Sequence, residues 1–441
     1  MRAMKDSGIA WIDKIPLGWT IKRLKWIVKF EKGLPITKDD LIKQGVPVVS
    51  YGQIHSKANN GTHLRDDLIR YVSEEYLESN PLSLGKKGDI FFADTSEDYA
   101  GIGNAVLIDV DSPVFAGYHT VIVRPDDQVY SRYLAYLFLT DAWRSQLCSR
   151  ASGIKVFSIT QGLLKKTTVI LPPAEKAIEM TAFLDRKCSQ IDAIIARQQE
   201  VIEKLKAYKL SVITEAVTKG LNPHAPMKDS GVEWIGEIPE QWEIRRIGSF
   251  AKVTSSKRIF EESYVDEGVP FYRSKEITDL SKGLNVQTEI FILEGIFAQV
   301  SKVSPAPKSG DILLTSIGTI GNTWISDGRK FYYKDGNITQ IEANDSFDSA
   351  YLEYCFSSNV VLEQYTRLAM GSTLLALTIV KIKKILVAFP PLNEQRKIVR
   401  FLRIKCGSIE NIVKHKQSLI NKLAAYKKSL IYEVVTGKKE I

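Results

Sequence analysis

The chain has 441 residues, of which 44% are apolar and 25% are charged, a balance typical of soluble globular proteins. This composition excludes a mainly disordered chain, a collagen and a small disulfide scaffold, and the length predicts two or three domains. The net charge of +9 is compatible with nucleic-acid binding but is weak evidence alone. Since no apolar run approaches the ~18 residues of a membrane-spanning helix, and no signal-peptide core begins the chain, we expect a cytoplasmic protein without membrane association.

An internal repeat dominates the chain. MKDSGIAWIDKIPLGWTIKR at 4–23 recurs as MKDSGVEWIGEIPEQWEIRR at 227–246, which is 223 positions later. Further along, YLAYLF at 133–138 matches YLEYCF at 351–356, with the offset reduced to 218. This many ordered matches indicate two tandem copies of one unit, the first with about five extra residues.

Each copy begins with short β-branched and aromatic runs separated by Gly, Pro, Asn and Asp, and ends with a long segment almost free of Gly and Pro. The pattern predicts an α+β fold with two strand-rich domains in a pseudo-twofold repeat, separated by two long helices. The predicted boundaries are 1–172 for the first domain, 173–220 for the first helix, 221–390 for the second domain and 391–441 for the second helix. Strands are expected at Ile90–Ala93, Ala105–Val110, Thr120–Arg124, Ile312–Thr315 and Thr323–Ser326.

Both long helices carry a heptad pattern of apolar residues. A narrow stripe of this kind suits a helix–helix contact, so we predict that the two helices form an antiparallel coiled coil. The alternative is that each helix packs only on its own domain. The predicted seam consists of Ile191, Ile194, Gln198, Val201, Leu205 and Tyr208 in the first helix, and Ile409, Ile412, Lys416, Leu419, Leu423 and Tyr426 in the second.

Known catalytic and metal-binding signatures are absent from the sequence. It contains no phosphate-binding GxxxxGK[ST] loop, no HExxH, GxSxG or CxxC motif, and no methyltransferase Asn/Asp-Pro-Pro-aromatic motif. The five histidines lack metal-ligand spacing, and the four cysteines lie far apart, which favours a reducing compartment. We therefore expect a binding protein with no catalytic residue and no metal site.

Two motifs carry a specific resemblance. WIxxIPxxWxIxR near the start of each copy, and FPPLNEQRKIVRFL at 389–402, resemble the specificity subunit of type I restriction–modification systems. The resemblance implies two target-recognition domains, each reading one half of a split double-stranded DNA sequence. It also implies that the helices set the gap between the halves and dock two modification subunits. One departure is PPAEKA at 172–177, where the second copy has PPLNEQ at 390–395.

By the same resemblance this chain binds no cofactor. S-adenosylmethionine is expected on the modification subunits, and ATP with Mg²⁺ on the restriction subunits that translocate and cleave DNA. A competing hypothesis is a DNA methyltransferase or nuclease with its own catalytic site, against which the missing motifs argue. A purely structural coiled-coil adaptor is a third possibility, although a scaffold has no need for two different loop surfaces.

DNA readout is expected where the two copies share a backbone frame but differ in side chain. The pairs are SYGQIH (50–55) with RSKEIT (273–278), ADTSEDYAGIGN (93–104) with TSIGTIGN (315–322), and SGIKVFS (152–158) with GSTLLAL (371–377). Arginine and lysine can donate to guanine, and glutamine can pair with adenine, whereas basic residues such as those of SSKR (255–258) suit phosphates. The predicted contacts are Tyr51, Gln53, His55, Thr95, Ser96, Tyr99, Lys155, Lys257, Arg258, Arg273, Ser274, Lys275, Thr315, Ser316, Thr319 and Ser372.

The charge distribution limits this interpretation. Residues 391–441 hold 12 basic and 4 acidic residues, whereas the two globular domains are nearly neutral. The domains must therefore gather their basic side chains on one face if they bind DNA. The strongly basic second helix could face either DNA or an acidic partner surface.

Overall fold

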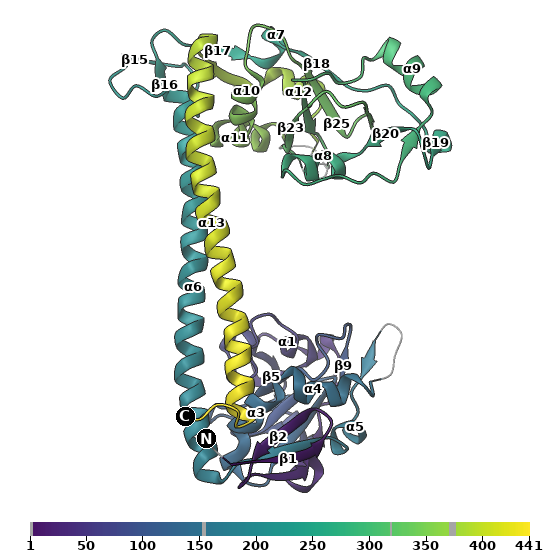
Figure 1. Ribbon diagram of the computed structural model, residues 1–441, viewed down its shortest axis with the longest axis vertical. Helices are drawn as coiled ribbons and strands as arrows, with labels where there is room; N and C mark the ends of the chain where they lie inside the picture. Colours follow the sequence, from purple (N-terminus) through teal and green to yellow (C-terminus); the bar gives the residue numbers. More distant parts are fainter. Residues whose placement is uncertain (1–2, 152–155, 318–319, 370–375) are drawn as a thin grey trace. The chain divides into compact units, whose positions relative to one another are not determined.

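The computed structural model describes residues 3–151, 156–317, 320–369 and 376–441, without the side chains of 368 and 369. The chain divides into two compact units, Met1–Gln198 with Ser418–Ile441, and Gln199–Gln417. Each unit contains one globular domain and a segment of both long helices, α6 (Ala174–Lys219) and α13 (Leu392–Val435) (Figure 1). Along the described residues, no helix is long and apolar enough to cross a membrane.

Two four-stranded sheets form the first domain. One is antiparallel, in the order β10 (Ala105–Leu107), β8 (Ile90–Ala93), β12 (Thr120–Pro125) and β4 (Val28–Lys32). The other has the order β6 (Arg70–Val72), β5 (Val46–Val49), β11 (Val114–Ala116) and β7 (Leu84–Gly85), with β5 and β11 parallel. Strand β8 is buried on both faces, since Phe92 packs in the larger apolar core and Phe91 in a smaller one, as the period of two requires.

Short elements complete the first unit. Its other strands are β1 (Met4–Ile9), β2 (Ile12–Pro16), β3 (Thr20–Arg23), β9 (Thr95–Ser96), β13 (Phe157–Ser158) and β14 (Thr168–Leu171). Its short helices are α1 (Tyr51–Ile54), α2 (Tyr76–Ser79), α3 (Ser131–Phe138), α4 (Asp141–Cys148) and α5 (Gln161–Lys165), with 3₁₀ turns at Leu24–Trp26, Lys38–Asp40, Asp66–Leu68, Pro81–Ser83 and Gln128–Tyr130.

The second domain repeats this plan. Its antiparallel sheet has the order β18 (Lys252–Thr254), β25 (Ile338–Glu342), β22 (Ile312–Thr315) and β23 (Thr323–Ile325). The other sheet has the order β19 (Tyr264–Val265), β21 (Phe291–Ile292), β20 (Val269–Tyr272) and β24 (Tyr332–Tyr333). Strands β20 and β24 are parallel, as are their counterparts β5 and β11, so the sequence repeat is also a structural repeat.

Around these sheets lie the remaining elements of the second unit. They are β15 (Met227–Asp229), β16 (Glu237–Pro239), β17 (Glu243–Arg246), β26 (Leu386–Phe389), α7 (Ile247–Phe250), α8 (Ser274–Ser281), α9 (Glu294–Val303), α10 (Ser349–Phe356), α11 (Asn359–Ala369) and α12 (Ile379–Lys384), with a 3₁₀ turn at Glu261–Ser263. The predicted α+β fold with two tandem domains and two long helices is confirmed.

Within each unit the two helix segments run antiparallel. In the first unit Met180 and Val434 border the same cavity, while Lys427 pairs with Asp192 at 2.6 Å, so positions rise along α6 as they fall along α13. In the second unit Lys209 pairs with Glu410 at 2.6 Å, at the positions equivalent to Lys427 and Asp192, while Lys219 and Phe401 border one cavity. The helices therefore pair in the predicted antiparallel sense in both units.

The buried stripe of each helix differs from the predicted seam at every second position. Ile191, Gln198 and Leu205 in α6, and Ile409, Lys416 and Leu423 in α13, are buried or half-buried as predicted. Between them, however, the buried residue lies one position after the predicted one. These buried or half-buried residues are Ile195, Ile202 and Lys209 in α6, and Val413, Ile420 and Lys427 in α13. Five predicted seam residues have exposed fractions of 43–55%, namely Ile194, Tyr208, Ile412, Leu419 and Tyr426, and Val201 is half-buried.

The physical reason for this correction is the ambiguity of apolar neighbours. Ile194 and Ile195, like Ile412 and Val413, are adjacent, so either member of the pair continues a spacing of three or four residues. In the last heptad of each helix the prediction chose a tyrosine, whereas the stripe contains a lysine. The aliphatic stem of a lysine can lie along an apolar seam while its ammonium reaches an acidic partner. Lys209 does this with Glu410.

Candidate nucleic-acid interface

Two of the predicted readout segments meet in the first domain. Helix α1 carries Tyr51 and His55 follows it, while β9 and the loop after it carry Ser96 and Asp98. These side chains and Asn104 line one cavity of 410 Å³. The fold thus joins 50–55 and 93–104, which are about 40 positions apart in the chain.

His55 holds the two segments together. Its Nδ1 lies 3.0 Å from the Asn104 amide nitrogen, and its Nε2 lies 2.7 Å from the Thr95 carbonyl oxygen. An amide NH₂ can only donate, so Nδ1 accepts and Nε2 carries the proton that it donates to Thr95. Both ring nitrogens are therefore occupied inside the domain, and His55 positions the loops rather than offering a free edge to a base.

The other predicted residues of this loop differ in exposure. Ser96 is buried and its hydroxyl donates to the Asp98 carbonyl at 2.7 Å, so Ser96 is a framework residue and its prediction as a contact is corrected. A Cβ on Gly101 would lie 2.4 Å from the Ser96 hydroxyl, so this close approach requires glycine. Tyr99, in contrast, is 61% exposed and packs its ring 4.5 Å from that of Phe157.

A third segment of the first domain was missed by the sequence prediction. The turn between β11 and β12 brings the rings of Tyr118 and His119 to within 5.5 and 5.4 Å of the Tyr51 ring. His119 adopts a φ of +53°, unusual for a residue with a side chain, and its Nδ1 lies 3.2 Å from Asp94 Oδ1. The available signal was the contrast between this turn and the corresponding DGN turn of the second copy, at 335–337.

The second domain builds a different surface on the same frame. Arg273 precedes α8 and its guanidinium pairs with the buried Glu276 at 2.9 Å, while Lys275 is exposed. Burial raises the pKa of the Glu276 carboxyl, but hydrogen bonds from Arg273 outweigh it and hold that pKa below its usual range. Arg273 is therefore kept charged and oriented by a partner on its own helix. The half-buried Ser274 donates to the Asn337 carbonyl at 3.4 Å.

The predicted phosphate contacts lie beside this helix. Arg258 is exposed and its Nε lies 2.8 Å from Asp335 Oδ2, while the backbone N–H of Lys257 donates to the Tyr332 hydroxyl at 2.9 Å. Since Asp335 belongs to the same turn as Asn337, the segments 255–258, 273–275 and 335–337 converge. The tertiary structure thus gathers basic side chains that the sequence spreads over about 80 positions.

Two predicted contacts in the second domain are framework positions instead. Thr315 and Ser316 are 0% and 2% exposed, because the strand β22 continues through Thr315. The Thr315 hydroxyl accepts from the Asn322 backbone N–H, and the Ser316 hydroxyl lies 2.7 Å from that of Thr339. Three further predicted contacts, Lys155, Thr319 and Ser372, lie outside the described residues.

A matching side-chain hydrogen bond shows that the two surfaces occupy equivalent positions in the repeat. Asn322 donates to the Thr278 hydroxyl at 3.2 Å, and Asn104 occupies the same position relative to His55. His55 and Thr278 are the last residues of the matched segments SYGQIH and RSKEIT. The frame is therefore shared, and the exposed chemistry differs: aromatic rings and amides in the first domain, and arginine and lysine in the second. Among the described residues, no group of three or more His, Cys, Asp or Glu is arranged to hold a metal ion.

Comparison with known proteins places this arrangement in a family. The family model described as "Type I restriction modification DNA specificity domain" matches residues 16–204 and 239–421. A putative type I restriction enzyme MjaX specificity subunit from Methanocaldococcus jannaschii is 26% identical, over 97% of this chain and 95% of its own length. The EcoKI specificity subunit of Escherichia coli is 20% identical, over 96% of this chain and 90% of its own length.

Solved structures agree on the fold. A chain from a structure of the type I restriction–modification system, solved to explain complex assembly and conformational transition, has a TM-score of 0.70 at 18% identity and covers 96% of this chain and 99% of its own. The HsdS subunit from Thermoanaerobacter tengcongensis has a TM-score of 0.51 at 16% identity, covering 98% and 100%. With both repeats matched by the family model, this chain belongs to the type I restriction–modification DNA specificity family.

Proposed function

We propose that this chain, as the DNA sequence-specificity subunit of a type I restriction–modification complex, binds a bipartite, asymmetric double-stranded sequence. Each globular domain reads one half. The observation that carries this proposal is the pair of matched surfaces, in which one backbone frame presents different side chains in each domain. Identical surfaces would read an inverted repeat, whereas different surfaces read two unlike half-sites.

In the first domain, Tyr51 and Gln53 are the proposed readers. The Gln53 side-chain oxygen accepts from the Ser50 backbone N–H at 3.1 Å, which orients its NH₂ group as a donor. Tyr99 and His119 lie on the two neighbouring segments and offer exposed rings at the edge of this surface. Such a surface suits hydrogen bonding to base edges with few phosphate contacts.

In the second domain, Arg273 and Lys275 are the proposed readers. Arginine donates two parallel hydrogen bonds to guanine O6 and N7, and the Glu276 ion pair lowers the entropy that Arg273 would lose on binding. Lys257 and Arg258 are the proposed phosphate contacts, which would fix the position of the domain on the duplex.

The remaining roles belong to partner subunits in this proposal. The chain docks two modification subunits, which carry S-adenosylmethionine, and joins restriction subunits, which use ATP and Mg²⁺. It performs no catalysis itself and works in the cytoplasm, where its four unpaired cysteines would stay reduced. The competing hypothesis is a methyltransferase or nuclease whose catalytic site lies within this chain.

Mapping of methylated sites tests the proposal. The chain would be co-expressed with modification subunits, and genomic adenine methylation would be sequenced for the wild type and for R273A/K275A. We expect the double variant to relax one half of the recognised sequence, since each good base contact contributes about 1–3 kcal/mol of discrimination. Changes in both halves would refute independent readout, and methylation of a duplex by the purified chain alone would establish the competing hypothesis.

A further inference from the structure

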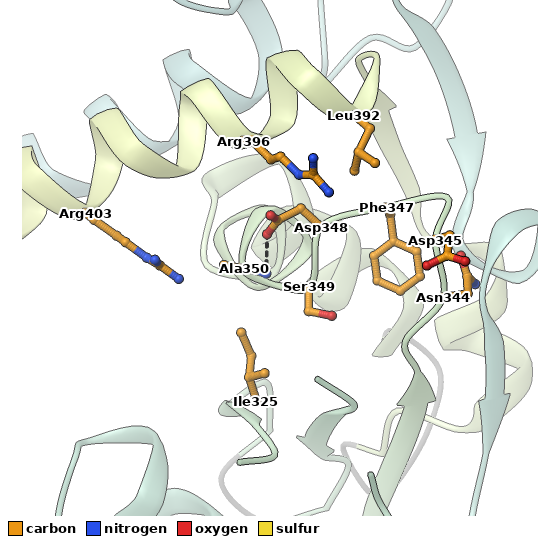
Figure 2. Close-up of a pocket in the computed structure, with 10 residues that line it drawn as sticks. All are labelled: Ile325, Asn344, Asp345, Phe347, Asp348, Ser349, Ala350, Leu392, Arg396 and Arg403. Atoms are coloured by element: carbon orange, nitrogen blue, oxygen red, sulfur yellow. Dashed lines mark hydrogen bonds between the residues drawn. The ribbon is translucent and has the colours of Figure 1, made fainter. Parts of the chain in front are cut away.

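A pocket of 450 Å³ lies in the second unit, between the first turns of α13 and the start of α10. Arg396 and Arg403, seven residues apart on one face of α13, both project toward it (Figure 2). Phe347, Leu392 and Ile325 supply apolar walls. The pocket therefore combines two arginines with two aspartates, Asp345 and Asp348, and with surfaces on which methylene groups can pack.

The first repeat shows why this pocket is open. At the positions equivalent to Ala350 and Arg403, the first repeat has Arg132 and Asp185, 218 residues earlier. Arg132 Nε lies 2.6 Å from Asp185 Oδ2, and the Tyr136 hydroxyl donates to Asp185 Oδ1 at 2.7 Å. In the second repeat alanine stands in place of the arginine and offers no long side chain, and arginine stands in place of the aspartate and carries the opposite charge.

The two arginines of the pocket lack a full ionic partner. Within the part of the chain that the structure describes, the guanidinium groups of Arg396 and Arg403 make no hydrogen bond or salt bridge. The helix segment 391–405 has five basic residues and one acidic residue, whereas the equivalent segment 173–187 has three of each. An excess of positive charge is thus specific to the second repeat.

Asp345 and Asp348 border the pocket and Glu353 interacts electrostatically with Arg403, so acidic groups offset part of this charge. Glu353 on α10 is half-buried, and burial raises its pKa to about 7, although Arg403 opposes the shift. Its carboxyl is consequently only partly ionised near neutral pH. Asp348, which borders the pocket, accepts hydrogen bonds from the Ala350 and Tyr351 backbone N–H groups through one carboxylate oxygen.

We propose that this pocket binds the carboxylate of a glutamate or aspartate side chain from a partner subunit, held between Arg396 and Arg403. The proposal rests on the docking role given above, and it makes docking unequal: the second repeat has an open acceptor for an acidic side chain, whereas the first fills its own. A single carboxylate with an apolar stem fits the mixed walls. A DNA backbone fits less well, since its charged phosphates along a polar sugar chain offer no apolar stem to Phe347 and Leu392.

Binding of a labelled hexaglutamate peptide to the full chain, followed by fluorescence anisotropy, tests the site. The variant R396A/R403A should weaken this binding at least tenfold, because it removes both cationic hydrogen-bond donors of the pocket. The control K397A/R400A removes the same charge from the same turns of α13 but no side chain of the pocket, and should change binding less than twofold. Hexaglutamine should not bind.

A second variant tests the comparison between repeats. A350R/R403D transplants the filled arrangement of the first repeat and should abolish peptide binding in a chain whose circular dichroism and thermal unfolding match the wild type. Equal effects of R396A/R403A and K397A/R400A, or no hexaglutamate binding by the wild type, would overturn the proposal.

A duplex-binding arm separates the possible occupants. If R396A/R403A weakened binding of a 30-base-pair duplex and left the peptide unaffected, the occupant would be DNA, and the proposal would again be overturned. Failure of the proposed readout function would appear differently, as a wild-type chain that gives no sequence-selective methylation with modification subunits.

Discussion

Replacing one buried tyrosine in each domain by phenylalanine should destabilise that domain alone. Tyr133 and Tyr351 are 0% and 1% exposed and occupy equivalent positions in the repeat. The Tyr133 hydroxyl lies 2.9 Å from the Ile170 carbonyl and 2.8 Å from that of Val435, the last residue of α13. The carbonyls of a helix's last turn have no partner within the helix, so this hydroxyl supplies a donor that they lack.

The second unit repeats the arrangement at the end of α6. The Tyr351 hydroxyl lies 2.9 Å from the Ala388 carbonyl and 3.2 Å from that of Val217. Burial raises the pKa of both hydroxyls far above the ordinary tyrosine value, so each remains protonated and able to donate at any working pH. Each tyrosine thus joins a strand end to a helix end within its unit.

The expected loss of stability follows from the single proton that each hydroxyl carries. Phenylalanine keeps the packing of the ring but leaves buried carbonyls without a donor, which costs about 1–3 kcal/mol, counted once per tyrosine. For a unit of roughly 150–250 residues, this corresponds to a fall in Tm of about 2–4 °C per kcal/mol. Y133F should act on the first unit and Y351F on the second.

Hydrogen exchange can assign the effect to a unit. Y133F should lower the protection of amides 430–435 and leave 213–218 unchanged, and Y351F should do the reverse. The control Y130F removes a hydroxyl that donates to the Pro172 carbonyl at 3.0 Å but is half-exposed, so water replaces it and the loss should stay below about 0.5 kcal/mol. Equal loss of protection in both units after Y133F, or no measurable loss, would refute the reasoning.

Three further outcomes are expected. The raised pKa of Glu353, about 7, favours the native state below pH 4.5, and this contribution to stability disappears as the pH rises through 7. E353Q should therefore raise the free energy of unfolding by up to about 3 kcal/mol at pH 8 and leave it unchanged at pH 4.5. An equal gain at both pH values in urea unfolding would contradict this. Exchanging residues 227–390 for those of a relative should alter one half of the methylated sequence, whereas changes to both halves would count against modular readout. The fragment 1–225 should form an antiparallel dimer, with Lys209 of each copy facing Asp192 of the other, and should direct methylation to an inverted repeat. A fragment that sediments strictly as a monomer and supports no such methylation would exclude this dimer.

The sequence alone was sufficient to predict the repeat and the type of most elements. Strands Ile90–Ala93 and Ile312–Thr315 appear in the structure with those bounds, because runs buried on both faces stand out against their Gly- and Asp-rich borders. The long helices were equally predictable from segments almost free of Gly and Pro. The choice between adjacent apolar residues in the seam was not, because Ile194 and Ile195 continue the same spacing and only packing against the partner helix selects one of them.

For the candidate interface, the sequence determined which segments to consider, since differences within a shared frame are visible by aligning the two copies. Which side chains face outward was decided by tertiary structure alone. Ser96 and Ser316 read as ordinary polar loop residues, yet hydrogen bonding inside the domain buries both. His119 was missed because its position beside Tyr51 depends on a pairing between strands far apart in the chain, and no local pattern encodes such a pairing.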